Sequence, residues 1–230
     1  MVETKNRLAL ALDYDDLVEA LRVARRFKDY FGIVKVGLEL YSATGPDAIG
    51  SMLDEGFSVF CDLKLYDIPT TVEKTAKVLG ALGASYLTLH AHGGTQMLRA
   101  GVEGLCEGAS SAQLSPPSAL AVTVLTSDNA APGHIVGDRV QIAKDSGCHG
   151  VICAGSDVEN VKRLAPEFLT VVPGIRLADS TKDDQKRFST PSDALGAGAD
   201  ILVIGRTVTK AKDPFAAAQR VVDEIEKSIN

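Results

Sequence analysis

The stretch C-D-L-K-L-Y-D-I-P-T-T, residues 61–71, joins the end of an apolar strand to the start of a helix. Three ionisable residues, Asp62, Lys64 and Asp67, fall within six positions. Residues two apart in a strand face the same side, so Asp62 and Lys64 are expected to project together from its carboxyl end. Pro69 suits the first turn of a helix, where its missing N–H would have no partner. A surface ion pair with an Asp helix cap is the alternative; the position at the end of a core strand favours a functional site.

The same order of apolar run and helix-like segment repeats eight times along the chain. The runs are mostly apolar without alternation, as expected for parallel strands that are covered on both faces. The predicted strands are 8–12, 33–36, 59–63, 86–90, 119–125, 150–153, 170–172 and 201–204. This pattern predicts a (β/α)8 TIM barrel, an α/β fold, with residues 1–230 forming a single domain. An open doubly wound sheet is the competitor, but eight units and the lack of G-x-G-x-x-G after the first strand weigh against it.

The composition is that of a soluble globular protein. The 230 residues are 45% hydrophobic and 23% charged, and the net charge of −6 argues against a nucleic-acid surface. The four cysteines form no C-x-x-C pair and are interpreted as reduced core residues of a cytoplasmic protein. The first residues lack the apolar stretch of a signal peptide, and no segment is long enough to span a membrane.

Helix signals flank several of the predicted strands. Asp15 or Asp16 is expected to begin the first helix, and Asp213 with Pro214 the last one. Two stretches are less regular. Residues 107–118 are predicted to be a plain connection, and the polar residues 177–187 a lid over the site.

Charged residues recur where the predicted strands end, which is where the chemistry of such barrels gathers. They are Asp13, Lys35, Asp62 and Lys64, followed by His90 on the fourth strand. A lysine inside a short apolar strand is costly unless it has a partner, so Lys35 is predicted to pair with Asp13 and Asp62. The alternative is that Lys35 extends outward between helices.

Two glycine turns that carry arginine follow the last two strands, in P-G-I-R at 173–176 and I-G-R-T at 204–207. Loops after strands seven and eight of a barrel commonly bind phosphate. Glycine permits close backbone approach and arginine grips two phosphate oxygens. Simple tight turns are the alternative for both glycines.

Other catalytic patterns are missing from the sequence. The four histidines show no zinc spacing, and there is no G-x-S-x-G, Walker or dinucleotide motif. His90 and His92 are expected to support the mouth of the pocket. The residues therefore predict a phosphorylated small-molecule ligand, with no metal and no organic cofactor.

The stretch D-L-K-L-Y-D-I-P-T-T at 62–71 resembles the D-x-K-x-x-D-I-P-x-T signature of the orotidine 5′-phosphate decarboxylase family. Further segments follow in the family's order: A-L-D at 11–13, K-V-G at 35–37, V-T-V-L-T-S at 122–127, P-G-I-R at 173–176, D-Q-K-R at 184–187 and V-I-G-R at 203–206. The resemblance implies cofactor-independent decarboxylation of orotidine 5′-phosphate to UMP, the last step of de novo pyrimidine synthesis. It also implies a homodimer with shared active sites, no nucleic-acid partner and no membrane.

The resemblance also implies roles for individual residues. Lys64 would protonate C6 of the pyrimidine, within a catalytic charge array of Lys35, Asp62, Lys64 and Asp67. Asp62 would lie beside the substrate carboxylate, and Asp13 and Lys35 would bind the ribose hydroxyls. The remaining contacts would come from Ile68 and Thr71, which with Asp67 reach the partner's site, from Thr126 and Ser127 at the pyrimidine, from Pro173 in the pocket wall, and from Arg176, Gln185, Gly205 and Arg206 at the phosphate.

Two other functions fit part of this pattern. A metal-dependent 3-keto-gulonate-phosphate decarboxylase shares the Asp-x-Lys of the third strand but needs a metal-binding acidic residue. A nucleotide-binding module without chemistry is the non-enzyme alternative, and the presence of Lys64 with both aspartates disfavours it.

Overall fold

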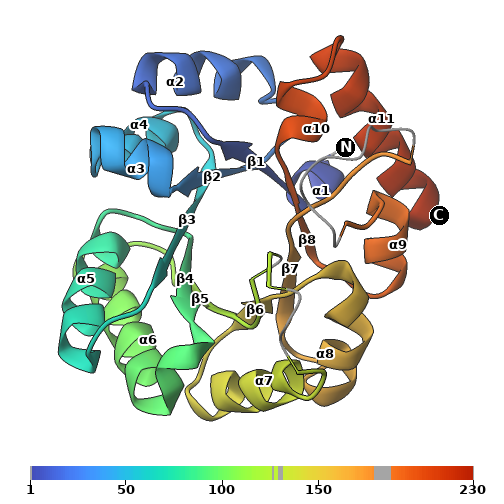
Figure 1. Ribbon diagram of the computed structural model, residues 1–230. Helices are drawn as coiled ribbons and strands as arrows, with labels where there is room; N and C mark the ends of the chain where they lie inside the picture. The colour runs from blue at the N-terminus through green and yellow to red at the C-terminus, as the bar shows by residue number, and fades with distance from the viewer. Residues whose placement is uncertain (1, 126, 129–131, 179–187, 230) are drawn as a thin grey trace.

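The computed structural model describes residues 2–125, 127–128, 132–178 and 188–229. Its eight strands form a closed parallel barrel in which each strand pairs with the next and β8 pairs with β1. Figure 1 shows this ring from one end, with the helices outside it. The predicted (β/α)8 barrel is therefore confirmed, and the open doubly wound sheet is excluded.

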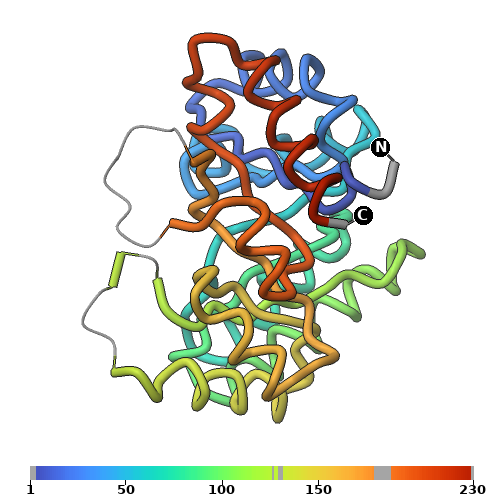
Figure 2. Tube along the Cα trace, turned by 90° about the vertical axis from the view of Figure 1, so that its right-hand side faces the viewer, coloured from blue at the N-terminus to red at the C-terminus, as the bar shows by residue number. Residues whose placement is uncertain are grey.

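The strands are β1 Leu8–Leu12, β2 Ile33–Gly37, β3 Ser58–Leu65, β4 Tyr86–His90, β5 Ser118–Val122, β6 Gly150–Ile152, β7 Leu169–Val172 and β8 Ile201–Ile204. The helices are α1 Val2–Lys5, α2 Leu17–Arg26, α3 Leu38–Thr44, α4 Asp47–Asp54, α5 Pro69–Ala81, α6 Gly94–Ser111, α7 Ile135–Asp145, α8 Val158–Leu164, α9 Pro191–Gly196, α10 Arg206–Thr209 and α11 Pro214–Ile229. Two short 3-10 helices, η1 Ala91–Gly93 and η2 Gly155–Asp157, follow β4 and β6. Figure 2, turned by 90°, shows α1 beside α11, and the two helices are in contact.

Two layers of apolar side chains explain why the strands do not alternate between apolar and polar residues. One layer fills the barrel and includes Ala9, Ile33 and Phe60. The other lies between the strands and the helices and includes Leu10 and Val34. Because both faces of each strand are covered, successive strand residues are buried on opposite sides.

The predicted caps of the first and last long helices are confirmed. Asp16 Oδ1 accepts a hydrogen bond from the backbone N–H of Glu19 at 2.8 Å, which fixes the start of α2. Asp213 Oδ1 accepts one from the N–H of Ala216 at 3.0 Å ahead of α11. An aspartate there satisfies a backbone donor that the helix itself leaves without a partner.

The prediction that residues 107–118 form a plain connection holds for 112–117 but is wrong for 107–111 and for 118, since α6 continues to Ser111 and β5 begins at Ser118. The glycines in the second half of α6 belong to a tight helix pair. A Cβ at Gly104 would lie 2.2 Å from the carbonyl oxygen of Glu73, and one at Gly108 would lie 2.0 Å from that of Lys77. The glycines therefore let the backbone of α6 approach that of α5, which a single sequence does not reveal.

The cysteines are all free, as predicted. Cys61, Cys148 and Cys153 are buried, and burial raises the pKa of each thiol to about 12. Cys106 on α6 differs from the expected core position, because it is only half-buried. Among the helices that the structure describes, none combines the length and the apolar composition of a membrane span.

Candidate functional site

A cavity of about 280 Å³ opens at the carboxyl ends of the barrel strands. Nine of the predicted site residues line it: Asp13, Lys35, Asp62, Lys64, Ser127, Pro173, Arg176, Gly205 and Arg206. The apolar part of its wall comes from the barrel interior, including Phe60, Val122, Ile152 and Val203. The strand-end prediction therefore places most of its candidates around one cavity.

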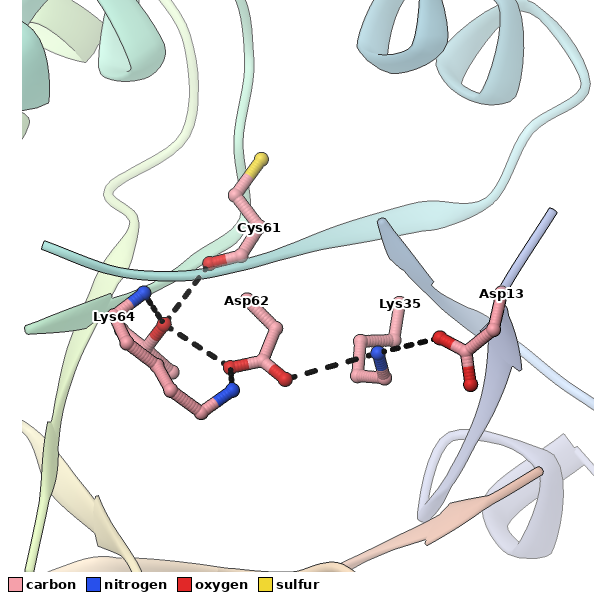
Figure 3. Close-up of polar contacts among 6 residues, drawn as sticks. Asp13, Lys35, Cys61, Asp62 and Lys64 are labelled. Atoms are coloured by element: carbon pink, nitrogen blue, oxygen red, sulfur yellow. Dashed lines mark hydrogen bonds and ion pairs between the residues drawn. The ribbon is translucent and has the colours of Figure 1, made fainter. Parts of the chain in front are cut away.

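A row of alternating charges crosses the mouth of β1, β2 and β3 (Figure 3). The Lys35 ammonium lies 3.2 Å from Asp13 Oδ1 and 3.7 Å from Asp62 Oδ2. The Lys64 ammonium donates to Asp62 Oδ1 at 2.7 Å. The side chains of Lys35 and Asp62 are only 12% and 14% exposed, so their charges are poorly screened by water and depend on one another. Lys35 thus faces the cavity as predicted, and the outward alternative is wrong.

The register of the sheet explains why these residues meet. Lys35 pairs with Ala11 on one side and with Phe60 on the other, and Gly37 pairs with Asp62. Side chains two apart in a strand share a face. Because Ile33 points into the barrel, Lys35 points into it as well.

Gly37 is a site residue that the sequence reasoning missed, although it closes the K-V-G segment. A Cβ at this position would lie 2.9 Å from the Lys35 ammonium and 3.6 Å from Asp13 Oδ1. A side chain here would push the ammonium out of the row, so glycine keeps the space that the charge occupies.

Lys64 reaches the row through an irregular piece of backbone that the simple alternation of a strand does not predict. The pairing of β3 with β4 passes from Cys61↔Leu87 to Leu65↔Leu89, so a bulge interrupts the ladder. Lys64 itself has φ of 49°, in the left-handed region. Holding a side-chain-bearing residue there costs on the order of 1–3 kcal/mol, and such residues cluster at functional sites.

Asp67, Ile68 and Thr71 do not line the cavity of their own chain. All three are exposed, and Asp67 Oδ1 accepts a hydrogen bond from the N–H of Ile68 at 2.6 Å, at the start of α5. Within one chain, Lys35, Asp62 and Lys64 of the predicted array come together, whereas the place of Asp67, expected in the site of a partner chain, stays a prediction. Asp13 occupies the fourth place in the row, because β1 lies next to β2 whereas Asp67 has already left β3.

The opposite part of the cavity wall carries the two arginines that follow β7 and β8. The Arg176 side chain is largely buried, and its Nη1 donates to Thr207 Oγ1 at 3.4 Å. Thr207 Oγ1 donates in turn to the carbonyl of Ile175 at 2.7 Å, which ties the two turns together. Gly174 has φ of 76°, so this glycine does make a tight turn, and it lines the cavity as well.

Two predicted contacts lie outside the described residues, namely Thr126 and Gln185, and so does most of the predicted lid at 177–187. Ser127, next to the first of them, lines the cavity after β5. β5 ends at Val122 rather than at the predicted Leu125, and the last ladder bond to β6 runs from the N–H of Thr123 to the carbonyl of Ile152 at 3.1 Å.

The histidines at the mouth of β4 support the surrounding structure, as expected. His90 Nδ1 accepts a hydrogen bond from the N–H of His92 at 3.2 Å, and the Tyr66 ring lies 5.8 Å from each imidazole. Burial, followed by the charge of Arg139, lowers the pKa of His90, which keeps its ring neutral at pH 7. Among the described residues, no three His, Cys, Asp or Glu side chains gather closely enough to hold a metal ion.

Comparisons with known proteins agree over nearly the whole chain. Residues 6–221 match the model of a family described as "Orotidine 5'-phosphate decarboxylase / HUMPS family". The orotidine 5'-phosphate decarboxylase of Paramagnetospirillum magneticum is 42% identical over 231 residues, covering 96% of this chain and 98% of that protein. That of Latilactobacillus sakei is 39% identical over 234 residues, with the same coverage of 96% and 98%.

Solved structures give the same picture. The crystal structure of orotidine 5'-phosphate decarboxylase from Lactobacillus acidophilus has a TM-score of 0.82 and 36% sequence identity, and the match covers 96% of this chain and 99% of that one. The corresponding protein from Pyrococcus horikoshii has a TM-score of 0.76 at 26% identity, with coverage of 95% and 99%.

Proposed function

Since the chain belongs to the orotidine 5′-phosphate decarboxylase family of carboxy-lyases, which catalyses the last step of UMP biosynthesis, we propose that it converts orotidine 5′-phosphate to UMP with Lys64 as the proton donor. The observation that carries this proposal is the row Asp13–Lys35–Asp62–Lys64 at the cavity mouth. The reaction uses no metal and no organic cofactor, so fixed charges of the protein must stabilise the transition state.

The order of the site groups around the barrel matches the order of the parts of the substrate. From β7 through β8, β1 and β2 to β3, the ring presents Arg176, Arg206, Asp13, Lys35 and finally Lys64. A nucleotide with its phosphate at the two arginines has its ribose at β1 and β2. Its pyrimidine then lies near β3, on the side of the ring opposite β7. Asp13 and Lys35 accept from and donate to the ribose hydroxyls in this arrangement.

The chemical step breaks the bond between C6 and the carboxylate carbon. Its electron pair stays on C6 while CO2 departs, and the pyrimidine ring delocalises this negative charge poorly. The Lys64 ammonium stabilises the charge and then transfers one proton to C6, giving UMP and a neutral amine that solvent reprotonates. Asp62, bound to the same ammonium at 2.7 Å, holds it in the row and repels the substrate carboxylate.

The arginines act far from the bond that breaks. Their binding energy holds the nucleotide in place, so that the pyrimidine is already oriented beside the fixed charges when the bond breaks. The proposal assigns the pyrimidine contacts to Thr126 and Ser127, and a further phosphate contact to Gln185.

The proposal includes a homodimer in which Asp67, Ile68 and Thr71 of one chain complete the site of the other. The support is that these residues are exposed and do not line the cavity of their own chain, although they follow the catalytic lysine closely in sequence. Ile68 is 67% exposed and the nearby Tyr66 is 60% exposed, so a second chain that packs here buries apolar surface. We also assign the protein to the cytoplasm, in line with its four free cysteines.

The decisive experiment follows the absorbance of orotidine 5′-phosphate with the purified chain and quantifies UMP, with and without EDTA. We expect one UMP per substrate consumed and the same rate in both conditions. A chain that binds UMP but leaves orotidine 5′-phosphate unchanged is a nucleotide-binding module. Activity on another sugar phosphate that EDTA abolishes would assign the chain to the metal-dependent relatives.

The shared site is tested by mixing two inactive variants, Asp67→Ala and Lys64→Ala. In a hybrid dimer one site has an intact Lys64 from its own chain and an intact Asp67 from its neighbour. Random exchange of equal amounts makes half of the dimers hybrids with one working site each, so activity should return to about a quarter of the wild-type value. If differently tagged chains exchange fully and no activity returns, each site is self-contained.

A further inference from the structure

Thr88 lies at the middle of β4, fully buried, and faces the bulge of β3. Between the pairs Cys61↔Leu87 and Leu65↔Leu89, it stands alone against three residues, 62–64. The regular ladder therefore supplies no backbone partner for the N–H of Lys64, and an unpaired buried N–H is costly.

The hydroxyl of Thr88 provides the acceptor that the ladder lacks. Its Oγ1 accepts a hydrogen bond from the backbone N–H of Lys64 at 2.8 Å. It donates to Asp62 Oδ1 at 3.2 Å, while the carbonyl of Cys61 is more distant at 3.5 Å. A hydroxyl has one hydrogen to donate, and the nearer, negatively charged acceptor binds it more strongly.

Thr88 Oγ1 thus binds both catalytic residues, Asp62 and Lys64. Asp62 Oδ1, which takes the hydrogen bond of Thr88, is also the atom to which the Lys64 ammonium donates at 2.7 Å. The same hydroxyl also binds the backbone N–H of Lys64, and so stabilises the residue whose φ of 49° is unfavourable.

We propose that Thr88 is a positioning residue for the decarboxylation, which fixes the Asp62 carboxylate and the Lys64 backbone so that the ammonium of Lys64 is aimed at the reacting carbon. This proposal rests on the proposed function. Thr88 does not line the cavity and binds Asp62 on Oδ1, the oxygen shared with Lys64, so its effect is expected mainly on the chemical step.

Thr170 provides a matched control at the amino end of the barrel. It is also a fully buried strand threonine, and its Oγ1 donates to a carboxylate, Asp200 Oδ2, at 2.9 Å. That carboxylate is paired with a lysine as well, Lys162, at 2.8 Å. Thr170 therefore carries the same threonine–aspartate–lysine contacts without any connection to the cavity.

The test compares Thr88→Val, Thr88→Ser and Thr170→Val for kcat, KM, affinity for UMP and Tm. We expect Thr88→Val to lower kcat between about tenfold and hundredfold, because displacements near 1 Å have effects of this size. Its affinity for UMP should stay within about twofold of wild type, since the loss falls on the transition state alone. Thr88→Ser should recover most of kcat, and Thr170→Val should lower Tm without changing kcat.

The proposal is overturned if Thr88→Val keeps the wild-type kcat, or if it loses UMP affinity and kcat together. Where Thr88→Val does not fold, Thr88→Ser and Thr88→Cys replace it, because both lack the methyl group and differ in the strength of the donor. A much lower kcat for cysteine than for serine supports the proposal, and equal values refute it. A wild-type chain without decarboxylase activity would instead refute the proposed function.

Discussion

Lys64→Ala is expected to abolish decarboxylation while the barrel stays folded. The substitution removes both the cation that stabilises the negative charge on C6 and the proton that C6 receives. Losses of about 10²–10⁴ for a general acid and about 10²–10³ for a preorganised charge together bring turnover below detection. The side chain is 32% exposed, and its removal leaves Asp62 paired with Lys35, so Tm should change little. Turnover of orotidine 5′-phosphate and thermal unfolding measure the two effects.

Lys77→Ala is the control for this variant. Lys77 is another partly exposed lysine that pairs with a carboxylate, Glu107, but it lies on α5 and does not line the cavity. Its removal should leave kcat unchanged and alter stability by less than about 1 kcal/mol. Substantial turnover by Lys64→Ala, with Lys77→Ala also active, would remove the proton-donor assignment.

Gly108→Ala is expected to lower the stability of the fold strongly. The new Cβ would lie 2.0 Å from the Lys77 carbonyl oxygen and 2.8 Å from its carbonyl carbon. These are backbone atoms, so α5 and α6 must separate along their contact. Overpacking typically costs about 1–3 kcal/mol, and a clash with backbone atoms places this variant at the upper end, about 3 kcal/mol. For a chain of this size that loss lowers Tm by about 6–12 °C.

Gly50→Ala provides the opposite case within the same fold. Gly50 lies in α4, and a Cβ there meets nothing within 4 Å. Alanine in an exposed helix interior is favoured over glycine by up to about 1 kcal/mol, so this variant should be slightly more stable than wild type. Equal Tm values for wild type and Gly108→Ala would mean that the two helices are not held at the distance described above.

The sequence predicted the barrel and most of its site because both follow from local rules. Runs of apolar residues locate the strands. Because side chains two apart in a strand share a face, Lys35 was expected to face the same side as Ile33. Since parallel strands share one carboxyl end, residues that are distant in sequence, such as Asp13 and Asp62, could be expected to meet.

The parts that were missed depend on contacts between elements. The bulge that turns Lys64 into the left-handed region is visible only in the pairing of β3 with β4. Thr88 gave a signal, a polar residue inside the apolar run L-T-L, but its hydroxyl has a role only because that bulge faces it. The extent of α6 was missed for the same reason, since its glycines are explained by the neighbouring helix rather than by a turn.

The uneven burial of the cysteines has a practical consequence for spectroscopy. Thiols with a pKa of about 12, those of Cys61, Cys148 and Cys153, hold almost no thiolate at neutral pH and are shielded from reagents. Cys106, half-buried on the outer helix α6, is the most accessible thiol. A maleimide dye therefore attaches to Cys106 first and reports on the protein from a point outside the barrel, with the native sequence unchanged.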